Sequence, residues 1–267
     1  MKTLLLDEKT THREYEYSEF VDFAEKTPKS TSHDNFSSRE GKKDFTGTNN
    51  FAEAIDFARH GWDSGLKQLE LENGTLANTG IEFEPTVAGA MVNIGAYLQG
   101  VPENMWAMRE NREYLLEELT IVVPLSYSAY ISEADALTFC KNIISIVNEY
   151  QAKYNVKLVG SFNTGQSKNG QPHRHIVDVV IKDFDVRFNI NNIAFAFHPS
   201  FFRRLWFVHL EAETYCTSGY GRPGATSDVK TIVTKNLGTN KVILLPALSS
   251  DNRGSKDISK EIQKFNF

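Results

Sequence analysis

Short apolar runs that alternate with amphipathic helices constrain the fold of the C-terminal part of the chain more than any other feature. Residues 119–124 read LTIVVP, and an apolar run of this length is typical of a buried strand. Ser132 with Asp135 then predicts a capped helix start. The apolar face of that helix would consist of Ala136, Phe139, Ile143, Ile144 and Val147.

The elements after this helix continue the alternation. Residues 156–162 and 176–183 are predicted strands, joined by a polar loop over 163–171, so we expect antiparallel neighbours. The later predicted elements are a helix from Asn189 or Asn191 to Phe197, a helix over 200–213, a strand over 241–245 and a terminal helix over 257–265. The order predicts an α/β fold with a doubly wound, mostly parallel sheet that contains one antiparallel strand. Ligands would gather beyond the carboxyl ends of its parallel strands.

The remaining sequence divides into two stretches before this domain of residues 116–267. Residues 1–49 are polar, and the segment 26–50 is predicted to be a linker or an arm that orders on a partner. Residues 50–115 are predicted to form a mainly helical unit, starting with a helix after Asn50 that breaks or bends near Gly61. We expect this unit to pack on the sheet and not to fold alone. Trp62 is then either a core residue or an exposed partner anchor.

The order of elements over 116–267 resembles a von Willebrand factor A-type domain. In that family the first strand ends in D-x-S-x-S, which binds a divalent metal, and a later strand ends in a second Asp. Here Ser126 and Ser128 match the serines, but Pro124 and Pro246 stand where the acids are expected. The resemblance therefore implies the fold without its metal site, because neutral hydroxyls alone do not repay the dehydration of Mg²⁺. Asp251 follows the later strand and is a candidate binding residue.

Phrases such as AIDFARHGWDSGLKQL and HPSFFRRLWF resemble uncharacterised proteins encoded by bacteriophages. This second resemblance suggests a source and no mechanism.

Three further segments carry candidate binding residues. His173 and His175 share a face at the start of a strand, where they are either solvent-facing or part of a metal or catalytic site. Arg203 and Arg204 point about 100° apart on a helix, so they serve the fold or contact an anion or partner. The glycine-rich loop with Tyr220 and Arg222 is either structural, partner-facing or an anion clamp.

The composition of the chain disfavours several classes of function. The formal charge of −5 disfavours a protein that binds the phosphate backbone of nucleic acids. Two cysteines in 267 residues fit a reducing cytoplasm. The apolar run near the start of the sequence is too short for a signal peptide. No apolar run reaches a membrane-spanning length. No complete catalytic motif, cofactor fingerprint or metal set is present, so an enzyme is disfavoured. We expect a cytoplasmic, non-enzymatic module that binds another protein of phage or host, with virion association as an alternative location. The alternative function is a nucleic-acid-binding or nucleic-acid-processing protein that uses Arg203, Arg204, Arg222, His173 and His175.

Overall fold

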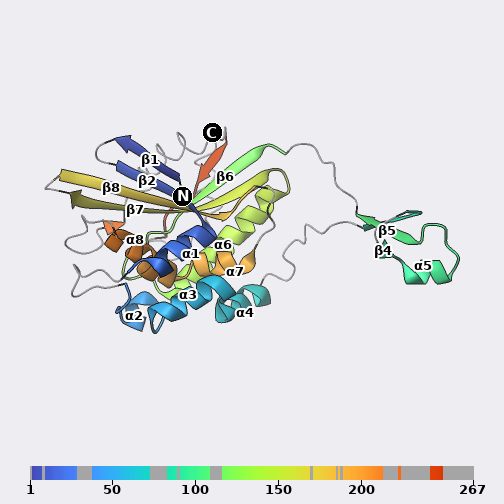
Figure 1. Cartoon of the computed structure of the whole chain (residues 1–267), viewed down its shortest axis with the longest axis horizontal. Coiled ribbons are helices and arrows are strands. Elements are labelled where there is room, and N and C mark those ends of the chain that lie inside the picture. The colour runs from blue at the N-terminus through green and yellow to red at the C-terminus, as the bar shows by residue number, and fades with distance from the viewer. Residues whose placement is uncertain are drawn as a thin grey trace. The chain divides into compact units, whose positions relative to one another are not determined.

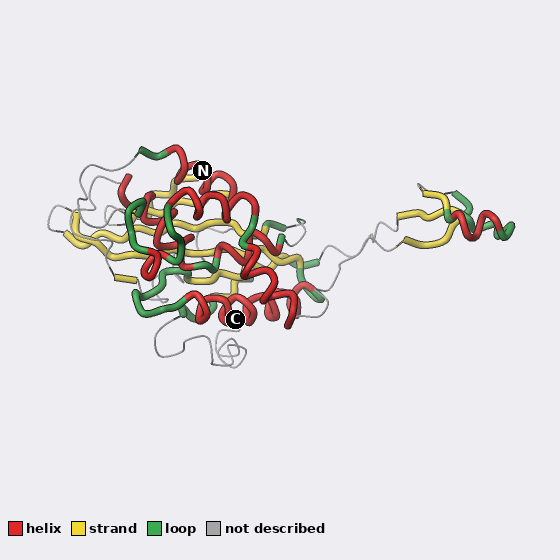
Figure 2. Tube along the Cα trace, turned by 90° about the horizontal axis from the view of Figure 1, so that it is seen from below, coloured by secondary structure: helices red, strands yellow, loops and turns green. Residues whose placement is uncertain are grey.

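A mixed sheet with one layer of helices forms the main unit of the computed structural model (Figures 1 and 2). The structure describes residues 2–7, 10–28, 38–72, 83–88, 91–108, 116–168, 171–184, 186, 189–212, 222–223 and 241–248. The chain divides into a unit of residues 1–72 and 117–267 and a second unit of residues 73–116. This division differs from the expected one, because residues 51–72 belong with the sheet. The strands of the main unit are β1 (Lys2–Asp7), β2 (Thr10–Glu16), β6 (Glu118–Pro124), β7 (Asn155–Lys168), β8 (Gln171–Lys182), β9 (Arg222–Pro223) and β10 (Val242–Leu244).

The sheet confirms the α/β prediction and its mixed character. Its strand order is β1-β2-β8-β7-β6-β10, and β9 pairs with β7. Across the five strands from β2 to β10, the β2·β8, β6·β7 and β6·β10 pairs are parallel and only β7·β8 is antiparallel. The antiparallel hairpin was predicted, but its arms are longer than expected. The predicted polar loop is mostly strand, because β7 extends to Lys168 and β8 begins at Gln171.

Residues 2–7 and 10–16 are strands of the sheet and not a polar arm. β1 and β2 form an antiparallel pair, and β2 adds to β8. The helix α1 (Tyr17–Lys26) follows and buries four residues, Tyr17, Phe20, Val21 and Ala24. The later part of the expected arm is ordered too, since Ser38, Thr46 and Thr48 are buried. Residues 29–37 lie outside the described chain.

The other helices of the main unit are α2 (Lys43–Thr46), α3 (Phe51–His60), α4 (Asp63–Glu72), α6 (Glu133–Gln151), α7 (Ile190–Ala196), a π-helix η1 (Phe201–Trp206) and α8 (Phe207–Ala212). The start of α6 is as predicted, with a capping box between Ser132 and Asp135. The described helices lie on one side of the sheet, as Figure 2 shows from below. A doubly wound sheet needs helices on both faces, so that part of the prediction is not met by the described residues.

Stacked aromatic rings fill the space between the sheet and the helices. Phe162 of β7 lies at the centre, with Phe20, Phe201, Phe202 and Trp206 at centroid distances of 5.8–6.1 Å. The Phe162 and Phe202 rings are nearly parallel, at 2°. All six residues of η1 are buried, so the wider π-helical turn lies inside the core.

The predicted break near Gly61 separates α3 from α4. Gly61 has a φ of 107°, which favours glycine, and Trp62 follows it. The Trp62 side chain is 3% exposed and its ring centroid lies 4.4 Å from that of His198. Trp62 is therefore a core residue, as one of the two readings of the sequence requires.

The second unit is a small antiparallel sheet with one short helix. Its elements are β3 (Phe83–Thr86), β4 (Met91–Val92), α5 (Ile94–Leu98) and β5 (Met105–Met108), with strand order β3-β5-β4. The sequence predicted a helical unit here, and the small sheet was missed. Asn93 caps α5, which buries none of its own residues.

No helix among the described residues is both long and apolar enough to cross a bilayer.

Candidate functional site

The serines after β6 serve the sheet and its neighbours. The Ser126 hydroxyl accepts a hydrogen bond from the Asn163 backbone amide at 2.9 Å and donates to the Asn163 carbonyl at 3.2 Å. The Ser128 carbonyl accepts a hydrogen bond from Arg203 at 2.7 Å, and the Ser128 hydroxyl is buried without a hydrogen-bond partner in the protein. The two hydroxyls thus differ in their surroundings, and Ser126 has a structural role.

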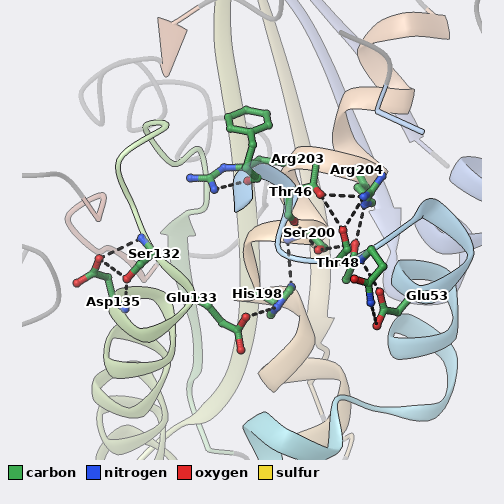
Figure 3. A network of polar contacts seen from close by, with 12 residues as sticks. Thr46, Thr48, Glu53, Ser132, Glu133, Asp135, His198, Ser200, Arg203 and Arg204 are labelled. Atoms are coloured by element: carbon green, nitrogen blue, oxygen red, sulfur yellow. Dashed lines mark hydrogen bonds and ion pairs between the residues drawn. The ribbon is translucent and has the colours of Figure 1, made fainter. Parts of the chain in front are cut away.

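Arg204 is an internal clamp that holds the segment 38–48 (Figure 3). Its Nε donates to Thr48 Oγ1 at 2.6 Å, and Nη1 donates to the Ser38 carbonyl at 2.8 Å. Nη2 donates to Thr46 Oγ1 at 2.8 Å and to the carbonyls of Thr48 at 2.7 Å and Gly41 at 3.0 Å. Burial lowers the pKa of Arg204 to about 10, which leaves it charged at neutral pH. The expectation of an anion or partner contact is wrong for this residue, because the side chain is fully buried.

Arg203 has a similar role on the adjacent side of η1. Nη1 donates to the Phe45 carbonyl at 2.6 Å, and Nη2 donates to the carbonyls of Ser128 at 2.7 Å and Ile131 at 2.9 Å. Its guanidinium also lies 4.9 Å from the Phe45 ring centroid. The side chain is 3% exposed, so the binding assignment of Arg203 is also wrong. Both arginines hold the segment 38–48, and Arg203 also ties residues 128–131 to the same buried helix.

A histidine, a serine and a glutamate meet beside these arginines, yet they do not form a nucleophilic site (Figure 3). His198 Nδ1 accepts a hydrogen bond from the Ser200 amide at 3.1 Å, and His198 Nε2 lies 3.5 Å from Glu133 Oε2. The Ser200 hydroxyl points instead to the Thr46 carbonyl at 2.5 Å. A nucleophile would need its hydroxyl on the histidine. This network holds helices together, and the sequence did not identify Glu133 as a member.

His175 is buried against the helical layer and not solvent-facing. Its Nε2 lies 3.2 Å from His209 Nδ1, and His209 Nε2 lies 2.9 Å from the Tyr15 hydroxyl. All three side chains are at most 2% exposed. His173 lies on β8, but its side chain lies outside the described residues. The pair therefore forms no described two-histidine site, and His175 is part of a buried hydrogen-bonded chain.

The remaining candidates lie wholly or partly outside the described residues. Arg222 lies in β9, whose backbone pairs with β7 at Gly165, and its side chain lies outside the described residues. Tyr220 and Asp251 also lie outside the described residues.

A second polar group lies on the opposite face of the sheet, and the sequence did not reveal it. His12 Nε2 lies 2.7 Å from Asp178 Oδ2, and both side chains are fully buried. Ser161 is directly opposite Asp178 in the β7·β8 ladder, and Asn163 lies two residues further along the same face. Asp178 Oδ1, Ser161 Oγ and both amide atoms of Asn163 are buried without a hydrogen-bond partner among the described residues. We name these four residues the sheet polar cluster.

Metal sites made from acids, histidines and cysteines alone are not found in the described part of the chain, where no three such residues are placed to hold one ion. The sheet polar cluster has one carboxylate, and its other unpaired atoms belong to neutral side chains. Its chemistry is therefore that of hydrogen bonds and hard oxygen atoms.

The buried histidines predict a loss of stability in acid. Burial lowers the pKa of His209, with further lowering by His175 and Arg13, and burial also lowers the pKa of His198. Below pH ~6.5 the unfolded chain binds protons that the folded chain does not, so the free energy of unfolding falls with pH by up to about 1.4 kcal/mol per pH unit for each histidine. Chemical denaturation at pH 7.5, 6.5 and 5.5 measures this slope.

The control for this prediction compares two variants. His209→Gln should flatten the dependence of stability on pH, whereas replacement of the exposed His60 by Gln should leave it unchanged. Equal slopes for the wild type and His209→Gln would contradict the assignment of the acid effect to His209.

The comparisons with known proteins place the whole arrangement in one family. No curated protein and no solved structure matches the chain. A family model described as a domain of unknown function, DUF7192, matches residues 8–267, which span both the sheet with its helices and the small second unit. The chain therefore belongs to the DUF7192 family.

Proposed function

We propose that the chain is a non-enzymatic protein-interaction module whose binding surface lies on the unit of residues 73–116. One observation carries the proposal: exposed large apolar side chains concentrate in this unit. Seven of the ten such residues in the described chain belong to it. They are Val87, Val92, Ile94, Tyr97, Leu98, Val101 and Leu116.

The helix α5 organises part of this surface. Ile94, Tyr97 and Leu98 are 69%, 63% and 77% exposed, and their spacing places them on one side of a helix. A monomer seldom leaves neighbouring large apolar groups in water without a use for them. Tyrosine is also enriched among residues that dominate binding energy. We name Ile94, Tyr97 and Leu98 the α5 patch.

Charge indicates the kind of partner. Residues 73–116 contain five glutamates, two arginines and no Asp, Lys or His, which gives this unit a formal charge of −3. The patch therefore fits a different protein whose apolar surface is bordered by lysine or arginine, because complementary charge favours the correct encounter. A second copy would bring acidic residues against acidic residues.

We expect Leu98→Asp to weaken binding of this partner by roughly 30-fold or more, as for a central hot-spot residue. A photo-reactive benzoylphenylalanine at the neighbouring Gln99 captures the partner in the source cells. The captured protein is then purified and titrated against wild type and variant by calorimetry.

Tyr130→Asp is the matched control, because Tyr130 is 79% exposed but lies on the main unit. Its affinity should stay within about twofold of wild type. Binding that is insensitive to Leu98→Asp contradicts the proposal. A wild-type dimer in sedimentation equilibrium that Leu98→Asp dissociates would assign the patch to self-association and overturn the heterologous partner.

The nucleic-acid alternative has no support from the described residues. It relied on Arg203 and Arg204, whose donors are directed at carbonyl and hydroxyl oxygens inside the fold. A steep salt dependence of single-stranded DNA binding would nevertheless favour it.

The A-type resemblance and the phage source remain part of the proposal. The order β6, α6, β7 and antiparallel β8, followed by β10 parallel to β6, supports the A-type arrangement. Action in the cytoplasm of a host cell fits the cysteine content of the chain.

A further inference from the structure

We infer that the sheet polar cluster binds a divalent cation of the hard, oxygen-preferring class, namely Mg²⁺, Mn²⁺ or Ca²⁺. This site is separate from the α5 patch and from the proposed interaction function. Its ligands would be Asp178 Oδ1, Ser161 Oγ and Asn163 Oδ1.

The strand register brings these oxygens to one place. Ser161 and Asp178 are Cα partners across β7·β8, and side chains opposite each other in such a pair have Cβ atoms about 4.5–5.5 Å apart. Asn163 is two residues along β7 from Ser161 on the same face and diagonal to Asp178, at a Cα separation of about 7–8 Å that an ion between the side chains can bridge. The three residues are 0%, 0% and 3% exposed, in the order Asp178, Ser161, Asn163. A small ion can contact all three, whereas an extended ligand would need more room.

The atoms that lack hydrogen-bond partners indicate which kind of ligand the site would bind. Three of the four are oxygens, and an ionised carboxylate can only accept. Such buried groups are costly unless something satisfies them. The Ser161 hydroxyl can itself donate to a neighbouring oxygen, but a cation at this place receives lone pairs from all three oxygens at once and balances the carboxylate charge. The chemistry of the group therefore favours a positive charge.

The surroundings of Asp178 fit a metal ligand. His12 holds the second carboxylate oxygen at 2.7 Å, which fixes the direction of Oδ1, as outer partners of metal-binding carboxylates do. Glu14 is the β2 residue opposite Asp178 and adds a second acidic side chain on this face. Magnesium uses one or two carboxylates and keeps several waters, so one direct carboxylate with two neutral oxygens predicts weak binding. The cluster also lies next to the carboxyl end of β6, since Pro124 pairs with Ser161.

The test is a titration of the full chain after EDTA treatment and desalting. MgCl₂, CaCl₂ and MnCl₂ at 10 mM, against NaCl of equal ionic strength, should raise Tm by roughly 3–5 °C for at least one ion. Calorimetry with the same salt should show one ion per chain. Asp178→Asn should abolish both effects, whereas Asp183→Asn, beyond the end of β8, should retain them.

A gain-of-binding variant keeps the test decisive if Asp178→Asn does not fold. Asn163→Asp adds a carboxylate and should tighten cation binding roughly tenfold, because ligand charge sets the affinity of such sites. The absence of a cation-specific Tm rise and of calorimetric binding in both wild type and Asn163→Asp would overturn the site. So would a crystal grown in MnCl₂ that shows an ordered water at Asp178 and no anomalous manganese peak.

Discussion

Arg204→Met should lower the free energy of unfolding by roughly 3–5 kcal/mol. Methionine fills much of the same space, but it leaves the carbonyls of Ser38, Gly41 and Thr48 buried without their donor. Denaturant unfolding followed by fluorescence measures the loss.

Arg204→Lys separates the charge from the shape of the guanidinium. Lysine keeps the charge but cannot direct five N–H groups in a plane, so it should recover only part of the stability. Arg59→Met is the surface control, because Arg59 is 37% exposed and pairs with Asp22 and Glu25, and it should change stability by less than about 1 kcal/mol. Near-wild-type stability of Arg204→Met would show that the segment 38–48 is not held as described.

Trp62→Ala should destabilise the chain by roughly 3–5 kcal/mol, because it removes a buried indole and leaves a cavity. The ring packs against His198 and against Gly65, where an added Cβ would lie 2.1 Å from a ring carbon. For a chain of this size the melting temperature should fall by roughly 6–20 °C in differential scanning calorimetry.

The exposed Tyr130 again supplies the comparison. Tyr130→Ala removes an aromatic ring without opening a cavity, and its melting temperature should stay within about 2 °C of wild type. A similarly small shift for Trp62→Ala would mean that the indole is an exposed partner anchor and does not pack against His198.

The elements that the sequence predicted well are those whose signals are local. The apolar run of β6 and the Ser132–Asp135 cap of α6 each depend on neighbouring residues, and both were located within one residue. The break at Gly61 and the cap at Asn189 belong to the same class.

Strand β2 was missed because it has polar residues on both faces. In β2, His12 and Glu14 lie on one face and Thr11 and Arg13 on the other, so no apolar alternation marks the strand. The hairpin ends of β7 and β8 were missed because they are polar as well. Their pairing depends on partners distant in sequence, which no local pattern contains.

The roles of polar residues were harder to predict than the elements that carry them. Arg204 meets its acceptors more than 150 positions earlier in the chain, and Asp178 meets His12 across 166 positions. The odd spacing between His175 and Asp178 places them on opposite faces of β8, but nothing in the sequence shows that both are buried.

Residues 73–116 lie in the chain between α4 and β6, at a place where its length can change at little cost. The host sheet is completed by strands on both sides of this insert, so changes within the insert leave the aromatic core and the arginine clamps intact. The entropic cost of a longer connection grows slowly, at about 0.6 kcal/mol for each doubling of its length. A change in the length of this segment should therefore cost the folded main unit little stability.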